Sequence, residues 1–126
     1  MRKYSKQKEA IRTYLTGRTD HPCAEQIYTA VKEMSPTVSL GTVYRNLGIL
    51  VEDGELARIS CGDGSEHYDP RTDMHGHFYC TACGELTDVE TPGMPGMKSK
   101  ISKAYGADVG AAMVVFNGVC GKCLKK

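Results

Sequence analysis

The stretch His75-Gly76-His77-Phe78-Tyr79-Cys80-Thr81-Ala82-Cys83 guides the interpretation of the chain, because it joins a His-x-His pair to a Cys-x-x-Cys pair. A second Cys-x-x-Cys pair follows near the end, at Cys120-Gly121-Lys122-Cys123. Each pair supplies two thiolates from one tight turn, and two such turns make the closed tetrahedral site typical of structural zinc. The sequence therefore predicts a Zn(II) site formed by Cys80, Cys83, Cys120 and Cys123.

The two cysteine pairs are separated by residues 84–119, a longer insert than a simple zinc ribbon uses. We expect this insert to fold as strand, helix and strand, with the metal tying its ends together. A rubredoxin-type iron site or a dithiol redox couple is the alternative interpretation of the four thiolates, and it would make the chain a small redox protein. No nucleophile with a paired base is evident, which argues against an enzyme.

With 126 residues, the chain is long enough for one ordinary domain or two small ones. It contains no apolar stretch long enough for a membrane span and no apolar signal core, so we expect a cytoplasmic protein without a membrane partner. Stable disulfides are unusual in that compartment, which favours metal thiolates. The two remaining cysteines, Cys23 and Cys61, are interpreted as ordinary buried or half-buried thiols, with a reactive or ligating role as the alternative.

The net charge of +1 conceals an uneven distribution. Basic residues crowd the beginning of the chain, where only Glu9 opposes Arg2, Lys3, Lys6, Lys8 and Arg12. Residues 59–97 are instead rich in carboxylates and contain three histidines. A basic segment suits a polyanion and an acidic, histidine-containing segment suits a cation, although either could equally be a solvated surface.

Apolar residues at helical spacing predict three short helices, at residues 7–16, 22–34 and 40–52. Pro22 suits a first helical position, and Ser39 is a natural N-cap for the third helix. Residues 55–60 and 66–69 are expected to be strands of a hairpin, joined by a glycine-rich turn. Three helices with tight joints followed by a hairpin predict a winged helix-turn-helix.

The third helix carries polar groups off its apolar stripe that suit phosphates and base edges. We predict that it contacts double-stranded DNA through Ser39, Thr42, Tyr44, Arg45 and Asn46. The alternative is an ordinary amphipathic helix with a polar outer face. The preceding helix and the following hairpin favour the DNA-binding interpretation.

A polar linker divides the chain, and we predict a first domain at 1–70, a hinge at 71–76 and a second domain at 77–126. In the second domain we expect strands near 78–79, 85–90 and 111–119, and a helix at 97–105. The predicted fold class is therefore α+β, with a winged-helix domain followed by a small α/β domain that holds the four-cysteine site.

His75 and His77 alternate along an extended segment and should point to the same side. Carboxylates bracket them, with Asp69 before and Asp88 after, and His21 offers a further nitrogen. Nitrogen and oxygen donors of this kind suit divalent iron, manganese or zinc.

Over nearly its whole length the chain resembles the ferric uptake regulator family of bacterial metalloregulators, and within it the peroxide-sensing branch. The motifs that carry this resemblance are Tyr4-Ser5-Lys6-Gln7-Lys8-Glu9-Ala10-Ile11, His21-Pro22, Thr42-Val43-Tyr44-Arg45-Asn46-Leu47, His75-Gly76-His77-Phe78-Tyr79-Cys80 and Gly118-Val119-Cys120-Gly121-Lys122-Cys123. It implies a homodimeric, metal-dependent repressor that binds a palindromic operator, with a winged-helix domain hinged to a dimerisation domain. It also implies a regulatory Fe(II) or Mn(II) ion held by His21, Asp69, His75, His77 and Asp88. His67 is outside that set and is interpreted as a surface or supporting residue.

The resemblance also distinguishes the branches of the family, because each branch carries typical residues at a few single positions. Asp69 stands where zinc sensors use a cysteine, and Asp88 stands where iron sensors carry glutamate, which favours peroxide response. An iron-responsive repressor is the alternative. Positions that form a second histidine-rich site in iron sensors are Met74, Gly76 and Ala112 here, which implies one regulatory metal per subunit.

For a peroxide sensor, the resemblance implies iron-catalysed oxidation of a ligating histidine, with His21 and His75 as the expected targets. The chain also lacks most of the helix that many relatives carry before Gln7, so we expect altered contacts to the DNA backbone or an altered dimer preference.

Overall fold

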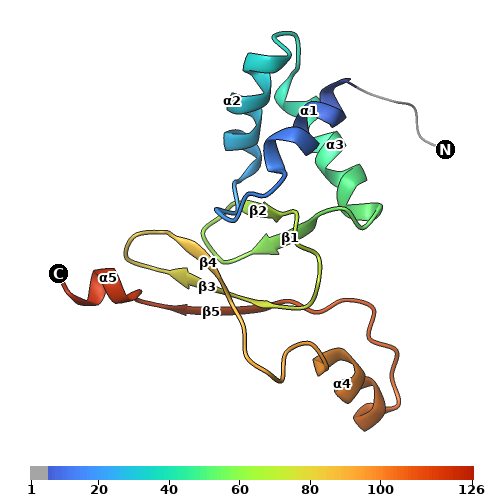
Figure 1. Ribbon diagram of the computed structural model, residues 1–126, viewed down its shortest axis with the longest axis vertical. Coiled ribbons are helices and arrows are strands. Elements are labelled where there is room, and N and C mark those ends of the chain that lie inside the picture. Colours follow the sequence, from blue (N-terminus) through green and yellow to red (C-terminus); the bar gives the residue numbers. More distant parts are fainter. Residues whose placement is uncertain (1–5) are drawn as a thin grey trace. The chain divides into compact units, whose positions relative to one another are not determined.

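The computed structural model describes residues 6–126, which fold into two compact units that divide between Thr72 and Asp73 (Figure 1). The predicted hinge, residues 71–76, includes this division. Arg2, Lys3 and the motif residues at positions 4 and 5 lie outside the described residues. Within residues 6–126, no helix combines the length and the hydrophobicity needed to cross a membrane.

The first unit contains three helices followed by a two-stranded antiparallel hairpin. Its elements are α1 (Lys6–Leu15), α2 (Ala24–Met34), α3 (Leu40–Glu52), β1 (Ala57–Ser60) and β2 (Glu66–Asp69). The hairpin pairs Ala57 with Asp69 and Ser60 with Glu66, so the glycine-rich turn between them closes as predicted. This order of elements confirms the winged-helix architecture expected from the sequence.

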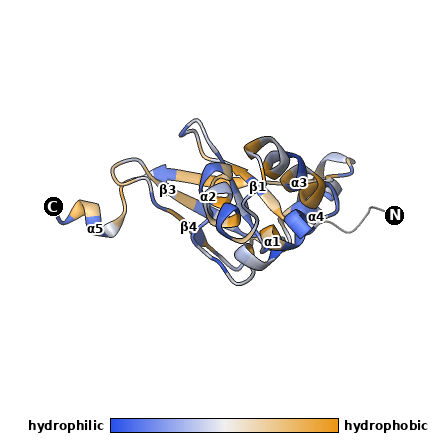
Figure 2. Ribbon diagram, turned by 90° about the horizontal axis from the view of Figure 1, so that it is seen from above, coloured by the Kyte–Doolittle hydropathy of each residue, from blue (hydrophilic) through white to orange (hydrophobic). Residues whose placement is uncertain are grey.

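Apolar side chains from all three helices form the core of the first unit, and Figure 2 shows hydrophobic residues in α1, α2 and α3. Fully enclosed side chains include Ile11, Ile27 and Leu47. Met34 and Leu40 are also apolar but are 51% and 37% exposed. Each lies at the end of its helix, where the neighbouring helices no longer cover the side chain.

Local capping explains where the helices begin. The Thr42 N–H donates to Oγ of Ser39 at 3.1 Å, which confirms Ser39 as the N-cap of α3 and contributes about 1 kcal/mol. α2 begins at Ala24 rather than at the predicted Pro22. The reason is that Cys23 has an extended backbone and bridges His67 of β2, so the chain is still pairing with the hairpin at that point.

The second unit contains a three-stranded sheet with two helices. Its elements are β3 (Gly76–Cys80), β4 (Leu86–Val89), α4 (Met97–Tyr105), β5 (Val114–Gly118) and α5 (Gly121–Leu124). The strand order is β4-β3-β5, with β4 antiparallel and β5 parallel to β3. The last strand is shorter than the predicted 111–119 because its pairing with β3 extends only over residues 114–118.

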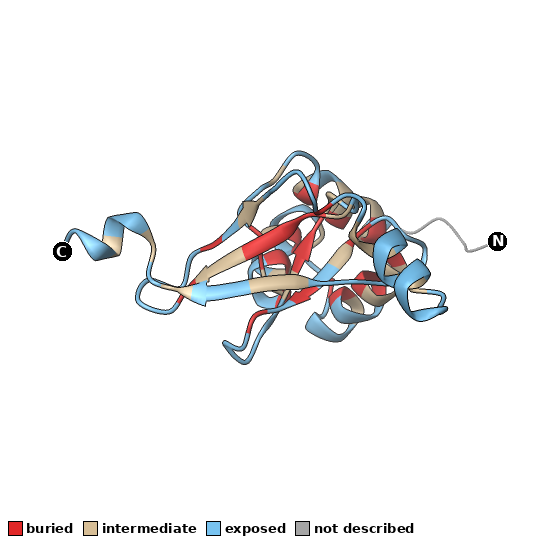
Figure 3. Ribbon diagram, turned by 90° about the horizontal axis from the view of Figure 1, so that it is seen from below, coloured by how far each residue is buried: buried red, intermediate tan, exposed pale blue. Residues whose placement is uncertain are grey.

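The helices of the second unit are exposed, and one of them was not expected. α5 was not predicted, since four residues are too few for a periodic pattern, and its first turn follows directly from Cys120. Neither α4 nor α5 contains a buried residue, and Figure 3 shows the C-terminal helix without buried positions. Exposed apolar side chains therefore gather in this unit, including Ile101, Met113 and Phe116.

Candidate metal centres

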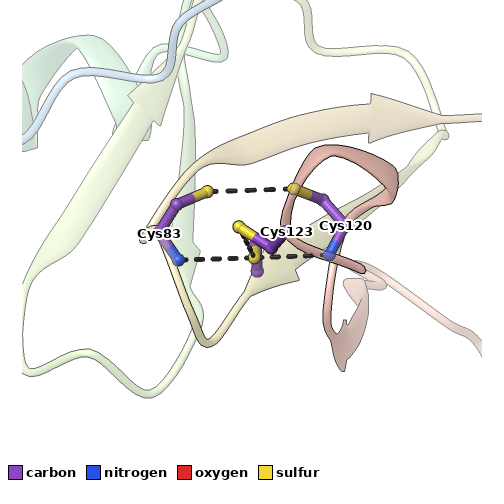
Figure 4. A group of neighbouring side chains, drawn as sticks. Cys83, Cys120 and Cys123 are labelled. Atoms are coloured by element: carbon purple, nitrogen blue, oxygen red, sulfur yellow. Dashed lines mark hydrogen bonds between the residues drawn. The ribbon is translucent and has the colours of Figure 1, made fainter. Parts of the chain in front are cut away.

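The four paired cysteines converge in the second unit. Figure 4 shows Cys83, Cys120 and Cys123 of this group. Cys80 ends β3, and its register partner is Gly118 of β5, so the chain delivers Cys120 beside it two residues later. Sulfur atoms lie 3.8 Å apart for Cys80 and Cys123, and 3.9 Å apart for Cys83 and Cys120. A tetrahedral ion with metal–sulfur bonds of about 2.3 Å requires about 3.8 Å between sulfurs, whereas a disulfide requires about 2.05 Å. The geometry fits a four-thiolate metal site.

Backbone groups prepare one of these thiols for deprotonation. The N–H groups of Cys120 and Cys83 donate to Sγ of Cys80 at 3.3 and 3.4 Å, and they lower the pKa of Cys80 to about 6. In contrast, a hydrogen bond with the Cys120 thiol, together with burial, raises the pKa of Cys123 to about 12. Four adjacent thiolates repel one another, so deprotonating the whole set requires a bound cation.

The first unit contains a buried histidine–aspartate pair. Nε2 of His21 is 3.2 Å from Oδ2 of Asp69, and both side chains are almost completely buried. The other carboxylate oxygen, Oδ1, accepts the N–H of Arg71 at 2.9 Å. The carboxylate is thereby oriented with one oxygen directed at the imidazole.

His21 has an unusual backbone, because its φ of 52° is the only positive value among the described residues other than glycine. Such a conformation costs of order 1–3 kcal/mol and persists only where neighbouring structure holds it. Strand β2 supplies that support. The carbonyl of His21 lies 2.7 Å from Nδ1 of His67, and the carbonyl of Pro22 accepts the N–H of Tyr68 at 3.0 Å.

Two histidines and a carboxylate gather in the second unit. His77 is the register partner of Asp88 across β3 and β4, and His75 precedes the same strand by one residue. Nε2 of His75 and Nε2 of His77 lie 3.0 and 3.4 Å from the same oxygen, Oδ1 of Asp88. The two imidazole rings have centroids 4.5 Å apart, so the histidines do point to the same side.

The protonation pattern of His75 suits a cation. Its Nδ1 lies 2.7 Å from the carbonyl of Asp73, which can only accept, so Nδ1 carries a hydrogen. Nε2 then faces a carboxylate, which also only accepts when it is ionised. A proton or a metal ion is needed between Nε2 and Asp88, and a histidine that ligates through one nitrogen while donating from the other is the usual arrangement in metal sites.

The predicted DNA-contact residues occupy the beginning of α3. Ser39, Tyr44 and Arg45 are exposed, and Thr42 is half-buried. The Tyr44 hydroxyl donates to Oε1 of Glu25 on α2 at 2.9 Å, which raises the pKa of Tyr44.

Asn46 does not share this outer surface. It is only 8% exposed and lies among the buried residues of α3, so it is not off the apolar stripe as expected, and its contact with DNA stays a prediction. The reason is helical geometry: Asn46 is three residues after Val43 and four residues before Leu50, so it shares their buried face.

A third group of ligand-type side chains was not predicted from the sequence. Cys61, Asp63 and His67 each offer a ligand atom within 4.8 Å of the others, in the turn and second strand of the hairpin. From the sequence, Cys61 was expected to be an ordinary thiol and His67 a surface or supporting residue. Their proximity depends on how the turn folds, which spacing alone did not indicate.

Comparison with known proteins establishes the family. The model of the ferric uptake regulator family matches residues 2–116. The chain belongs to the ferric uptake regulator family. Its members are transcriptional regulators, and their function as metal-dependent repressors accounts for the coexistence of a helix-turn-helix and two groups of candidate metal ligands in one chain.

Individual relatives cover almost the whole regulator. The peroxide operon regulator of Bacillus subtilis is 34% identical over 120 residues, covering 95% of this chain and 83% of its own length. The ferric uptake regulation protein of the same organism is 33% identical over 126 residues, covering 96% and 85%. These similar identities show the family but do not distinguish its peroxide-responsive branch from its iron-responsive branch. Only the ligand residues can be used to propose the branch.

Solved structures show the same fold. The Campylobacter jejuni peroxide stress regulator superposes with a TM-score of 0.80 at 28% identity, covering 93% of this chain and 88% of its own. The Helicobacter pylori ferric uptake regulator superposes with a TM-score of 0.81 at 22% identity, covering 98% and 83%. The second likeness, at its low identity, is evidence of fold only.

Proposed function

We propose that this regulator is a peroxide-responsive repressor that binds DNA when Fe(II) or Mn(II) occupies one regulatory site per subunit. The ligands would be His21, Asp69, His75, His77 and Asp88. The observation that carries the proposal is the pairing of imidazole nitrogens with carboxylate oxygens at 3.0–3.4 Å, in both units and without sulfur. Donor sets of nitrogen and oxygen suit iron and manganese, whereas sensors of softer metals rely on thiolates.

The peroxide-responsive branch is proposed because of the two carboxylates, Asp69 and Asp88. Resemblance within the family associates aspartate at positions 69 and 88 with peroxide response, and the similar peroxide operon regulator agrees with it. When bound, Fe(II) would supply the one-electron chemistry by which peroxide adds one oxygen atom to a ligating imidazole. His21 and His75 would be the modified residues. An iron-responsive repressor is the second candidate, favoured by the comparable similarity to a ferric uptake regulation protein.

The first unit would make the DNA contacts. We propose residues 1–70 as the DNA-binding domain, with Ser39, Thr42, Tyr44 and Arg45 at the beginning of α3 facing the major groove. A helix N-terminus also favours phosphate binding. A palindromic operator follows if two copies bind together, because the symmetry of a dimer matches the symmetry of its site.

The second unit, residues 77–126, would form the homodimer, as expected for this family. Its apolar side chains are exposed in the single chain, with Phe116 of β5 and Ile101 of α4 at 50% and 45%. β5 is also an edge strand, whose outer backbone groups need a partner or water. A second copy of the same unit would cover both features.

The decisive experiment measures binding to a palindromic operator with Fe(II) and with Mn(II), before and after peroxide. Mass spectrometry of the His21 and His75 peptides is performed on the same samples. We expect both metals to support binding, and only the iron form to lose it, with one oxygen gained on a histidine. Unchanged binding of the oxidised iron form would favour the iron-responsive alternative. Equal binding with and without metal would refute both.

Metal analysis separates the regulator from a small redox protein. A colourless chain with one zinc per four-cysteine site supports the structural role of Cys80, Cys83, Cys120 and Cys123. A visible thiolate–iron spectrum from that site would instead support electron transfer.

A further inference from the structure

A cluster in the wing of the first unit has the composition of a metal site. It consists of the Cys61 thiol, the Asp63 carboxylate and the His67 imidazole, with ligand atoms within 4.8 Å of one another. We propose that these three side chains bind a zinc-type divalent ion, at a site separate from the four cysteines and from the regulatory ligands. The proposal does not depend on the regulator's signal or on its DNA target.

His67 has the orientation of a metal ligand. Its Nδ1 lies 2.7 Å from the His21 carbonyl, which only accepts, so Nδ1 carries a hydrogen and Nε2 is the ligating nitrogen. Nε2 lies 2.7 Å from Oδ2 of Asp63, a second acceptor. Nε2 of the ring and Oδ2 of the carboxylate are therefore directed at each other, and both face the position where a shared ion would bind. His75, between the Asp73 carbonyl and Asp88, has the same arrangement.

Asp63 is oriented by the turn that contains it. Its Oδ1 accepts the N–H of Ser65 at 3.0 Å, which leaves Oδ2 directed at His67. Gly62 and Gly64, on either side, have φ values of 92° and 86°, a conformation that favours glycine. Burial alone would raise the pKa of Asp63, but hydrogen bonds from His67 and Ser65 outweigh it and lower the pKa, so the carboxylate is ionised.

Cys61 completes the set with a sulfur. Its side chain is buried, and that burial raises the pKa of the thiol, so the free thiol is protonated at neutral pH. A divalent ion that binds the sulfur would displace this proton to solvent, forming one metal–sulfur bond for each S–H bond lost. Sulfur, nitrogen and oxygen donors together suit zinc and its spectroscopic substitute cobalt better than magnesium or calcium.

The geometry is close to what a tetrahedral ion needs. Bond lengths of about 2.3 Å to sulfur and about 2.0 Å to nitrogen and oxygen place donor atoms about 3.3–3.5 Å apart. The contact of 2.7 Å between His67 and Asp63 would open by roughly half an ångström around such an ion. Their side chains are 12% and 20% exposed, so an ion could enter, and water could take the fourth position.

Cobalt binding to full-length protein tests this site. The four-cysteine site is first filled with zinc, and Co(II) is then titrated while thiolate-to-cobalt absorption and retained zinc are measured. The regulatory ligands contain no sulfur, so cobalt there cannot produce this absorption. We expect one cobalt per chain to produce it with zinc retained. No such absorption, or zinc released in step with cobalt uptake, overturns the proposal.

Single substitutions assign the absorption to residues. Cys61→Ser should abolish it, and Asp63→Asn and His67→Gln should each weaken the affinity at least about tenfold. Cys23→Ser, which removes the other unpaired thiol, should leave it unchanged. Absorption that persists in Cys61→Ser, or disappears in Cys23→Ser, overturns the assignment. If Cys61→Ser folds poorly by circular dichroism, Asp63→Asn in the exposed turn decides the outcome, and an unchanged affinity refutes the site.

Discussion

Nε2 of His21 lies 3.2 Å from Oδ2 of Asp69, and the two residues are brought together by pairing between strand β2 and the segment before α2. His67 and Tyr68 of the same strand hydrogen-bond to the carbonyls of His21 and Pro22. The strained backbone of His21 is therefore held by the residues that immediately precede its carboxylate partner. A proposed sensing ligand is positioned by the wing itself.

Substitution at this pair should separate regulation from folding. Asp69→Asn keeps the shape of the side chain and the contact to the Arg71 N–H, but it removes the charge that a cation needs. We expect metal-dependent operator binding to weaken at least about tenfold, while the zinc content remains unchanged. The measurement is fluorescence anisotropy with Mn(II). Asp20→Asn, on an exposed carboxylate paired with Arg18, is the matched control and should bind as the parent does.

Loss of one thiolate should affect the second unit much more than loss of an unpaired thiol. Cys80 is completely buried, and its sulfur accepts hydrogen bonds from two backbone N–H groups. Serine at this position removes the sulfur that these groups contact and leaves only three thiolates for the metal. We expect Cys80→Ser to lose zinc and either unfold the second unit or abolish dimer formation. Metal analysis and sedimentation check this outcome, with Cys23→Ser as the control. Normal zinc content in Cys80→Ser would contradict the four-cysteine assignment.

Much of this architecture could be predicted because the signals are local. The N-cap at Ser39, the left-handed glycine after α4 and the paired cysteines each depend on neighbouring residues. The parallel pairing of β3 with β5 could not be predicted in that way, because it joins strands separated by β4 and α4.

The cluster of Cys61, Asp63 and His67 in the wing could not be predicted from the sequence for a related reason. Cys61 and His67 are six positions apart, without a ligand spacing of a known kind, and only the turn that contains Gly62 and Gly64 brings them to Asp63. Asn46 was misplaced because helix polarity was judged by residue type, whereas its angular position puts it with Val43 and Leu50.

Arg45 offers a direct test of the DNA-contact surface. It is exposed on the first turns of α3, and an arginine there would contact a phosphate or a guanine edge. We expect Arg45→Ala to reduce operator affinity by about 1–3 kcal/mol and, if the contact is to a phosphate, to lower the salt dependence by about one unit. Binding titrations at several salt concentrations measure both. Lys32→Ala on α2, whose ammonium lies over the Tyr28 ring, is a charge-matched control. Equal losses in both variants would mean that only net charge matters.

An ion pair between α1 and the segment after α3 should make the stability of the first unit depend on pH. Arg12 donates from Nε and Nη2 to the two carboxylate oxygens of Glu55 at 2.9 and 2.8 Å, and this contact lowers the pKa of Glu55. A carboxylate with a lowered pKa adds stability above its unfolded pKa, and that contribution is lost as pH falls through the folded value.

Glu55→Gln measures this contribution. Both side chains are more than a third exposed, so solvent screening limits the effect to about 0.5 kcal/mol at neutral pH. Denaturant unfolding of the parent and the variant should differ by that amount at pH 7 and converge in the acidic range below the ordinary pKa of glutamate. High salt should also reduce the difference, because the pair is exposed. Glu33→Gln, at an exposed carboxylate of α2, controls for the general loss of one negative charge. A difference that persists unchanged at acidic pH would show that Glu55 acts through packing rather than through its charge.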